Sequence, residues 1–80
     1  MKNPIQKHLD ETNKSVADFA KEVGVTKPTV YSWINGKYSP THGTSREIAR
    51  TMDISRTKFR KLWSQWEKEQ EGDEKYRRRR

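Results

Sequence analysis

Apolar side chains recur along this chain of 80 residues at the spacing of amphipathic helices. The clearest run places four of them at i, i+3, i+4 and i+7, on one side of a helix: Val16, Phe19, Ala20 and Val23. Ser15 and Asp18 have the spacing of a capping box before this run, and Gly24 suits a turn with positive φ after it. The pattern therefore predicts a helix between Ser15 and Gly24.

A second helix is predicted over residues 26–35. Thr26 suits its N-cap, and Pro28 falls in its first turn, where a missing N–H costs no helical hydrogen bond. The inward side of this helix comprises Val30, Trp33 and Ile34. Because Ala20 is small enough for a close crossing of two helices, the segment 15–36 has the pattern of a helix-turn-helix.

Three further helices are predicted around this pair. The first begins with Asn3 as its cap and ends within residues 10–13. The fourth begins at Thr44, which has capping-box spacing with Glu47, and the fifth begins at Arg56. Their inward apolar side chains are Ile5 and Leu9, then Ile48, Ala49 and Met52, then Phe59, Leu62, Trp63 and Trp66.

The expected fold is all-α, a compact five-helix helix-turn-helix domain over residues 1–66. Residues 67–80 have almost no apolar side chains, so we expect the last helix to fray near Gly72 and to continue into a disordered charged tail. Two interpretations stay open for Arg77–Arg80: a phosphate-binding arm, or a solvated charged end. Two also stay open for the aromatic stripe of the last helix, which either completes the core or also forms a dimer contact: Phe59, Trp63 and Trp66.

The net charge of +7 indicates a polyanionic partner. Residues 1–66 carry twelve Lys and Arg against six Asp and Glu, so the basic excess lies on the predicted domain and favours nucleic acid. The chain has no cysteine, no apolar run of membrane length and no signal-like opening, which favours a soluble protein of the cytoplasm, either of a host cell or associated with a bacterial nucleoid. We expect His8 and His42 to be isolated surface side chains, and therefore no enzyme activity, metal, cofactor or small-molecule ligand.

The spacing from Ala20 to Gly24, Val30 and Trp33 resembles the helix-turn-helix of the phage repressor and Cro family, also called the xenobiotic response element type. The closing sequence Trp33–Lys37 strengthens the resemblance, which covers roughly residues 3 to 66. It implies five packed helices that bind double-stranded DNA. It also implies a sequence-specific transcription regulator, a repressor or Cro-like protein of a phage, plasmid or prophage, that forms a homodimer on two half-sites.

The polar side of the predicted 26–35 helix is the candidate DNA-reading face. By resemblance, Lys27, Pro28 and Ser32 match the positions that meet base edges, and Tyr31 lies beside them. A Lys can donate to guanine, a Ser can donate or accept, and a Pro can contact a thymine methyl group. Helix N-termini and their flanks attract phosphates, which makes seven residues candidates for backbone contacts: Lys14, Ser15, Thr26, Thr29, Asn35, Lys37 and Tyr38.

The sequence departs from the family pattern at three positions. Where many members pair an Arg with a Glu, this chain has Leu9 and Ile34, and an apolar contact there costs little. Val16 occupies a position at which a polar residue often meets phosphate. Residues 31–37 also echo winged-helix excisionases and mercury-resistance regulators, but those need a β-wing where residues 45–52 predict a helix. A protein-interaction adaptor that uses the aromatic last helix is the alternative function.

Overall fold

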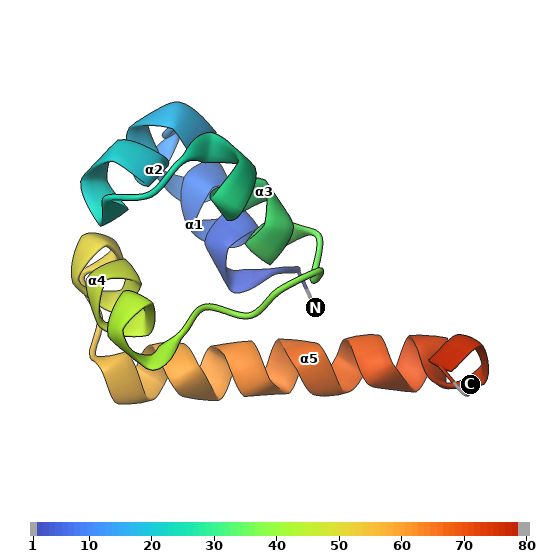
Figure 1. Cartoon of the computed structure of the whole chain (residues 1–80). Helices are drawn as coiled ribbons and strands as arrows, with labels where there is room; N and C mark the ends of the chain where they lie inside the picture. Colours follow the sequence, from blue (N-terminus) through green and yellow to red (C-terminus); the bar gives the residue numbers. More distant parts are fainter. Residues whose placement is uncertain (1, 79–80) are drawn as a thin grey trace.

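The computed structural model describes the backbone of residues 2–78 and the side chains of residues 2–70. The described part forms five helices and no strand, which confirms the all-α prediction: α1 Pro4–Thr12, α2 Val16–Val23, α3 Lys27–Ile34, α4 His42–Met52 and α5 Arg56–Arg78. Figure 1 shows α1 to α4 gathered on one side of α5, the longest helix. The helix-turn-helix pair α2 and α3 lies on the side of this group that faces away from α5.

The start of α1 is fixed by Asn3, which is 5% exposed and makes two kinds of contact. Its Oδ1 accepts hydrogen bonds from the backbone N–H groups of Ile5 at 2.9 Å and Gln6 at 3.3 Å, as the predicted cap requires. Its Nδ2 also donates to the carbonyl oxygen of Trp33 at 3.2 Å, at the end of α3. One buried amide therefore caps α1 and holds the C-terminal end of α3.

The turn between α2 and α3 follows the sequence prediction. The Ser15 Oγ accepts a hydrogen bond from the Asp18 N–H at 3.0 Å, and Ala20 is 3% exposed within the core. Gly24 ends α2 with a φ of 93°, and its N–H donates to the Ala20 carbonyl at 2.8 Å. A side chain at Gly24 would be strained at this φ, because L-residues rarely adopt it. The half-buried Val25 then packs against the core as the second helix approaches.

Two predicted caps are wrong in detail. The Thr26 side chain occupies the N-cap of α3 without accepting a backbone hydrogen bond, because its hydroxyl pairs with that of Thr29 at 2.9 Å. Helix α4 begins at His42 and not at Thr44, because Thr41 is its N-cap and accepts from the Thr44 N–H at 3.3 Å. The loop after α3 is correspondingly shorter than predicted.

A single apolar cluster joins all five helices. Its largest fully buried side chains are Phe19, Phe59, Ile5, Ile48 and Val30. The aromatic stripe of α5 belongs to it entirely: Phe59, Trp63 and Trp66 are 1%, 6% and 6% exposed. The core of one chain therefore buries all three side chains, and the exposed remainder that a dimer contact through them requires is missing. Leu9, which replaces the charged partner of the family pattern, is also buried, and Ile34 packs against the same cluster.

His8 is not the surface side chain that the sequence predicts. Its ring lies 5.9 Å from that of Phe19 between ring centres, and its Nε2 is buried with no hydrogen-bond partner among the described residues. Burial lowers the pKa of the His8 imidazole, and the positive charge of Lys14 lowers it further, against smaller opposing effects of Glu11 and Glu22. The neutral form of His8 is therefore favoured in the folded protein.

Helix α5 is assigned as far as Arg78 and so runs past Gly72, the position where the sequence predicts fraying. The side chains of residues 71–80 lie outside the described residues, as do the backbones of residues 79 and 80. The expectations of a charged tail and of a phosphate-binding arm at Arg77–Arg80 fall on this part. The division of the chain after residue 66 stays a prediction.

Candidate nucleic-acid interface

The two sides of α3 differ completely in exposure. Val30 and Trp33 are 0% and 4% exposed in the core, as predicted. Lys27 and Pro28 are exposed at the first turn, and Tyr31 is 49% exposed one turn further along. Because Lys27 makes no ion pair among the described residues, its ammonium group is available to an acceptor outside the protein. Three of the four residues proposed from the sequence to read bases, Lys27, Pro28 and Tyr31, thus lie together on one solvent-facing side.

Ser32 is the exception on this side, because it is half-buried and already engaged. Its hydroxyl donates a hydrogen bond to the Pro28 carbonyl oxygen at 3.0 Å, one turn earlier in α3. Serine in a helix often forms this bond, which uses its only proton. In this conformation Ser32 can accept a hydrogen bond from a ligand but cannot donate one.

The candidate phosphate-binding residues fall into two groups. Lys14 is half-buried, and its Nζ lies 2.6 Å from the Glu22 Oε1, so its charge is already paired. Lys37 and Tyr38 follow α3 with exposed side chains, and the Lys37 Nζ lies 5.9 Å from the centre of the Tyr38 ring. The remaining candidates are exposed or half-buried around the starts of α2 and α3 and the end of α3: Ser15, Thr26, Thr29 and Asn35.

A hydrogen-bonded junction that the sequence did not indicate holds the loop after α3. The Ser39 hydroxyl donates to the Glu67 Oε2, and the Trp63 Nε1 donates to the same oxygen at 2.9 Å. Trp63 and Glu67 are four residues apart on α5, and this spacing is the only local signal of the contact. The junction ties the segment that carries Lys37 and Tyr38 to α5.

Pairing divides the basic side chains of the described residues. Four cations lie near carboxylates on their own or a neighbouring helix: Lys2 near Asp10, Lys7 near Glu11, Lys14 near Glu22 and Arg50 near Glu47. No carboxylate among residues 2–70 pairs with the others: Lys21, Lys27, Lys37, Arg46, Arg56, Lys58, Arg60, Lys61 and Lys68. Five of these nine cations lie on α5, and the other four lie one each on α2, α3, the loop after α3 and α4.

Among the described residues, no cluster of three or more His, Asp or Glu side chains could hold a metal ion. No helix within this described part combines the length and apolarity needed to cross a membrane.

A family model described as helix-turn-helix matches residues 5–59, more than half of the chain. The match runs from α1 into the first turn of α5 and includes the whole α2–α3 pair. Searches of curated proteins and of solved structures found no match. The matched family, the five-helix fold and the Gly24 turn agree with the sequence pattern, and the chain therefore belongs to the Cro/C1-type helix-turn-helix family of DNA-binding transcription regulators.

Proposed function

We propose that this protein regulates transcription by inserting α3 into the major groove of double-stranded DNA and reading its sequence there. The observation that carries the proposal is the division of α3, which buries Val30 and Trp33 while exposing Lys27, Pro28 and Tyr31. The major groove of B-DNA admits one α-helix, and residues near the helix N-terminus meet the base edges. Family membership supports DNA as the partner.

Each residue on this side has a proposed role. Lys27, at the first position of α3, donates to the O6 and N7 acceptors of a guanine, and Pro28 contacts a thymine methyl group. Ser32 accepts from an amino group of a base, because its proton is used within the helix. Tyr31 presents a hydroxyl and an aromatic ring at the edge of this surface.

The backbone contacts of this proposal lie on either side of α3. Lys37 and Tyr38 follow the helix and contribute a cation and a hydroxyl. Ser15, Thr26, Thr29 and Asn35 surround the helix ends, where free backbone N–H groups attract phosphate. Lys14 contributes less than Lys37, because Glu22 already compensates its charge.

The biological setting is part of the same proposal. A small regulator of this family acts by covering a promoter or an origin, as a repressor or Cro-like protein of a phage, plasmid or prophage. A homodimer would place two copies of α3 on half-sites about one helical turn apart. Its contact lies elsewhere than in the buried Phe59, Trp63 and Trp66. The burial of these side chains favours DNA binding over the adaptor alternative, which relies on the aromatic side of α5.

Selection of bound duplexes from a random pool tests the proposal most directly. We expect a defined consensus, palindromic if the protein binds as a dimer. The affinity for the selected duplex should fall steeply as salt rises, with a slope of log affinity against log salt of about −0.9 per phosphate neutralised. Failure to bind any duplex at low salt would exclude the proposed function, and binding without enrichment of a sequence would exclude specific reading.

A further inference from the structure

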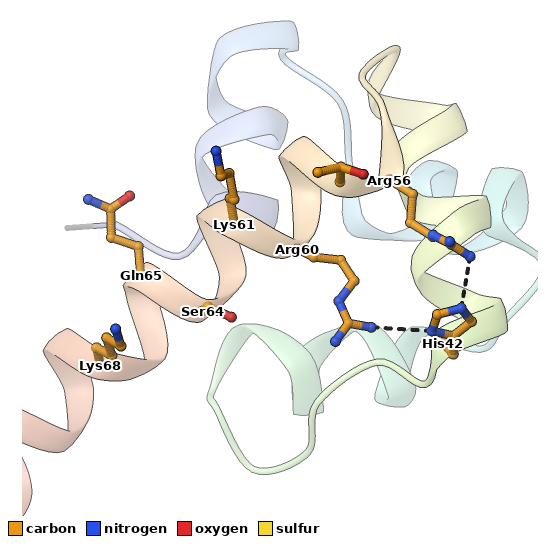
Figure 2. A pocket seen from close by; sticks show the side chains of 8 residues that line it. His42, Arg56, Arg60, Lys61, Ser64, Gln65 and Lys68 are labelled. Atoms are coloured by element: carbon orange, nitrogen blue, oxygen red, sulfur yellow. Dashed lines mark hydrogen bonds between the residues drawn. The ribbon is translucent and has the colours of Figure 1, made fainter.

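A shallow groove runs between the start of α4 and the first half of α5, outside the helix-turn-helix pair. Five of its eight lining residues carry cationic or imidazole side chains, and none of the eight is acidic: the five are His42, Arg56, Arg60, Lys61 and Lys68. Figure 2 shows the Arg56 and Arg60 side chains extending from α5 toward the His42 ring on α4. The family match ends at residue 59, so the second of these arginines lies beyond it.

The two ring nitrogens of His42 cannot both form hydrogen bonds with the arginines beside them. Its Nε2 lies 2.8 Å from the Arg56 Nη1, and its Nδ1 lies 3.4 Å from the Arg60 Nη1. A neutral imidazole has one acceptor nitrogen and one N–H donor, whereas a guanidinium group only donates. One of the two contacts must therefore set a donor against a donor. An anionic oxygen beside the ring would accept from the guanidinium groups and from the imidazole N–H together.

The protein supplies no such oxygen among its described side chains. No carboxylate of residues 2–70 pairs with Arg56 or Arg60, whereas Lys2, Lys7 and Lys14 each have one. The groove thus holds two adjacent guanidinium groups without a counter-charge in this part of the chain.

The arrangement of the groove favours an extended anion over a small one. Arg56, Arg60, Ser64 and Lys68 are spaced four residues apart and so follow one side of α5. At 1.5 Å per residue, this row extends over roughly 18 Å. Three cations and one hydroxyl along this length suit successive phosphates of a nucleic-acid strand, and arginine binds phosphate through two parallel hydrogen bonds.

We propose that His42, Arg56 and Arg60 form a second phosphate-binding site for the backbone of duplex DNA, separate from the face that α3 presents. This inference rests on the proposed function. The groove adjoins the loop after α3, because Arg60 and Ser64 also line a small cavity with Ser39 and Pro40 of that loop. Glu67 lines the same cavity, where its carboxylate accepts hydrogen bonds from Ser39 and Trp63.

The test compares two double variants of the full chain that remove equal charge. Arg56→Ala with Arg60→Ala alters the groove. Lys21→Ala with Lys58→Ala is the control, because both lysines are exposed and unpaired among the described residues, and Lys58 lines a different groove beside Pro4 and His8. Affinity for a mixed-sequence duplex is measured by fluorescence anisotropy over a salt series. Thermal melting checks that both variants stay folded.

We expect the groove variant to lower the magnitude of the salt slope by about 2, since each lost phosphate contact removes about 0.9. The control should keep the slope of the unchanged protein. Equal losses in both variants would overturn the phosphate site while leaving DNA binding intact. No duplex binding by the unchanged protein would overturn both proposals.

A polyglutamate peptide tests whether the groove binds an acidic protein segment and not nucleic acid. Loss of polyglutamate binding in the groove variant, with an unchanged duplex slope, would assign the groove to an acidic protein segment and overturn the nucleic-acid site. Retention of the expected slope difference in the presence of excess polyglutamate supports it.

Discussion

The inner and outer sides of the α2–α3 pair perform different tasks with adjacent residues. On the inner side, Ala20, Val30 and Trp33 are nearly inaccessible to solvent. On the outer side, the Lys27 side chain is exposed and that of Tyr31 is 49% exposed. Changes on the inner side should therefore alter stability, whereas changes on the outer side should alter DNA binding at constant stability. Each prediction below tests how strictly this separation holds.

Ala20→Leu should have the largest effect, because it adds volume at the helix crossing. Ala20 is 3% exposed, and overpacking a close-packed site costs about 1–3 kcal/mol or more. We expect the free energy of unfolding to fall by that amount in chemical denaturation. Ala17→Leu is the matched control, because Ala17 is exposed on the same helix and a leucine there meets solvent. Equal stability of the two variants would contradict the helix pair itself.

Lys27→Ala and Lys37→Ala should separate base reading from phosphate binding on the outer side. Loss of Lys27 should reduce discrimination between the selected duplex and a mismatched one by about 1–3 kcal/mol, the value of a good base contact. Loss of Lys37 should weaken all duplexes alike and lower the magnitude of the salt slope by about 1. Neither variant should change the melting temperature. The same loss of discrimination in both would refute the assigned roles.

His8, a half-buried residue of α1 whose ring lies beside Phe19 of α2, tests how a titrating group next to the core affects stability. Because burial lowers its folded pKa below 6.5, the unfolded chain binds more protons between the two values. The free energy of unfolding should therefore fall as pH drops through 6.5, and level off below the folded pKa. Denaturation between about pH 8 and pH 5 measures it, since histidine titrates in this range.

His8→Leu provides the comparison, because leucine keeps an apolar contact with Phe19 and does not titrate. This variant should lose the decrease in stability over that range. The pKa of Asp10 is lowered from 3.8, mainly by its hydrogen bond from Lys2. Asp10 therefore changes the free energy of unfolding only at more acidic pH, outside the range in which His8 is measured. A decrease that persists in His8→Leu would assign it to another group.

The sequence predicted the helices and the side each one buries, because both depend on signals within a few residues. Apolar spacing identified Phe19 and Trp33 as inward, and local polar side chains identified the caps at Asn3 and Ser15. The start of α4 was missed because Thr41 and Thr44 both suit a cap, and the choice depends on the path of the loop before them. That path depends on the contact between Ser39 and Glu67, which are 28 residues apart.

The candidate site was predictable to a similar extent. The exposure of Lys27 and Tyr31 follows from the helical period of their buried neighbours. The hydrogen bond from Ser32 to the Pro28 carbonyl and the ion pair between Lys14 and Glu22 do not follow from the helical period. Each depends on which rotamer the side chain adopts. The groove at His42 was missed for another reason: its members come from two helices whose crossing is set by packing, not by local sequence.

Substitution of Lys14 should have the smallest effect on duplex binding, and it tests whether an ion pair within the protein keeps a cation from contacting DNA. Its ion pair with Glu22 at 2.6 Å compensates its charge, so Lys14→Ala should change the salt slope of duplex binding less than Lys37→Ala does. Glu22→Gln should free the ammonium group and steepen the slope, with little loss of stability because partly exposed pairs contribute about 0–1 kcal/mol. Anisotropy over a salt series measures both variants. If Lys14→Ala flattens the slope as much as Lys37→Ala, the pair opens on binding, and carboxylate pairing in the free protein does not determine which cations meet DNA.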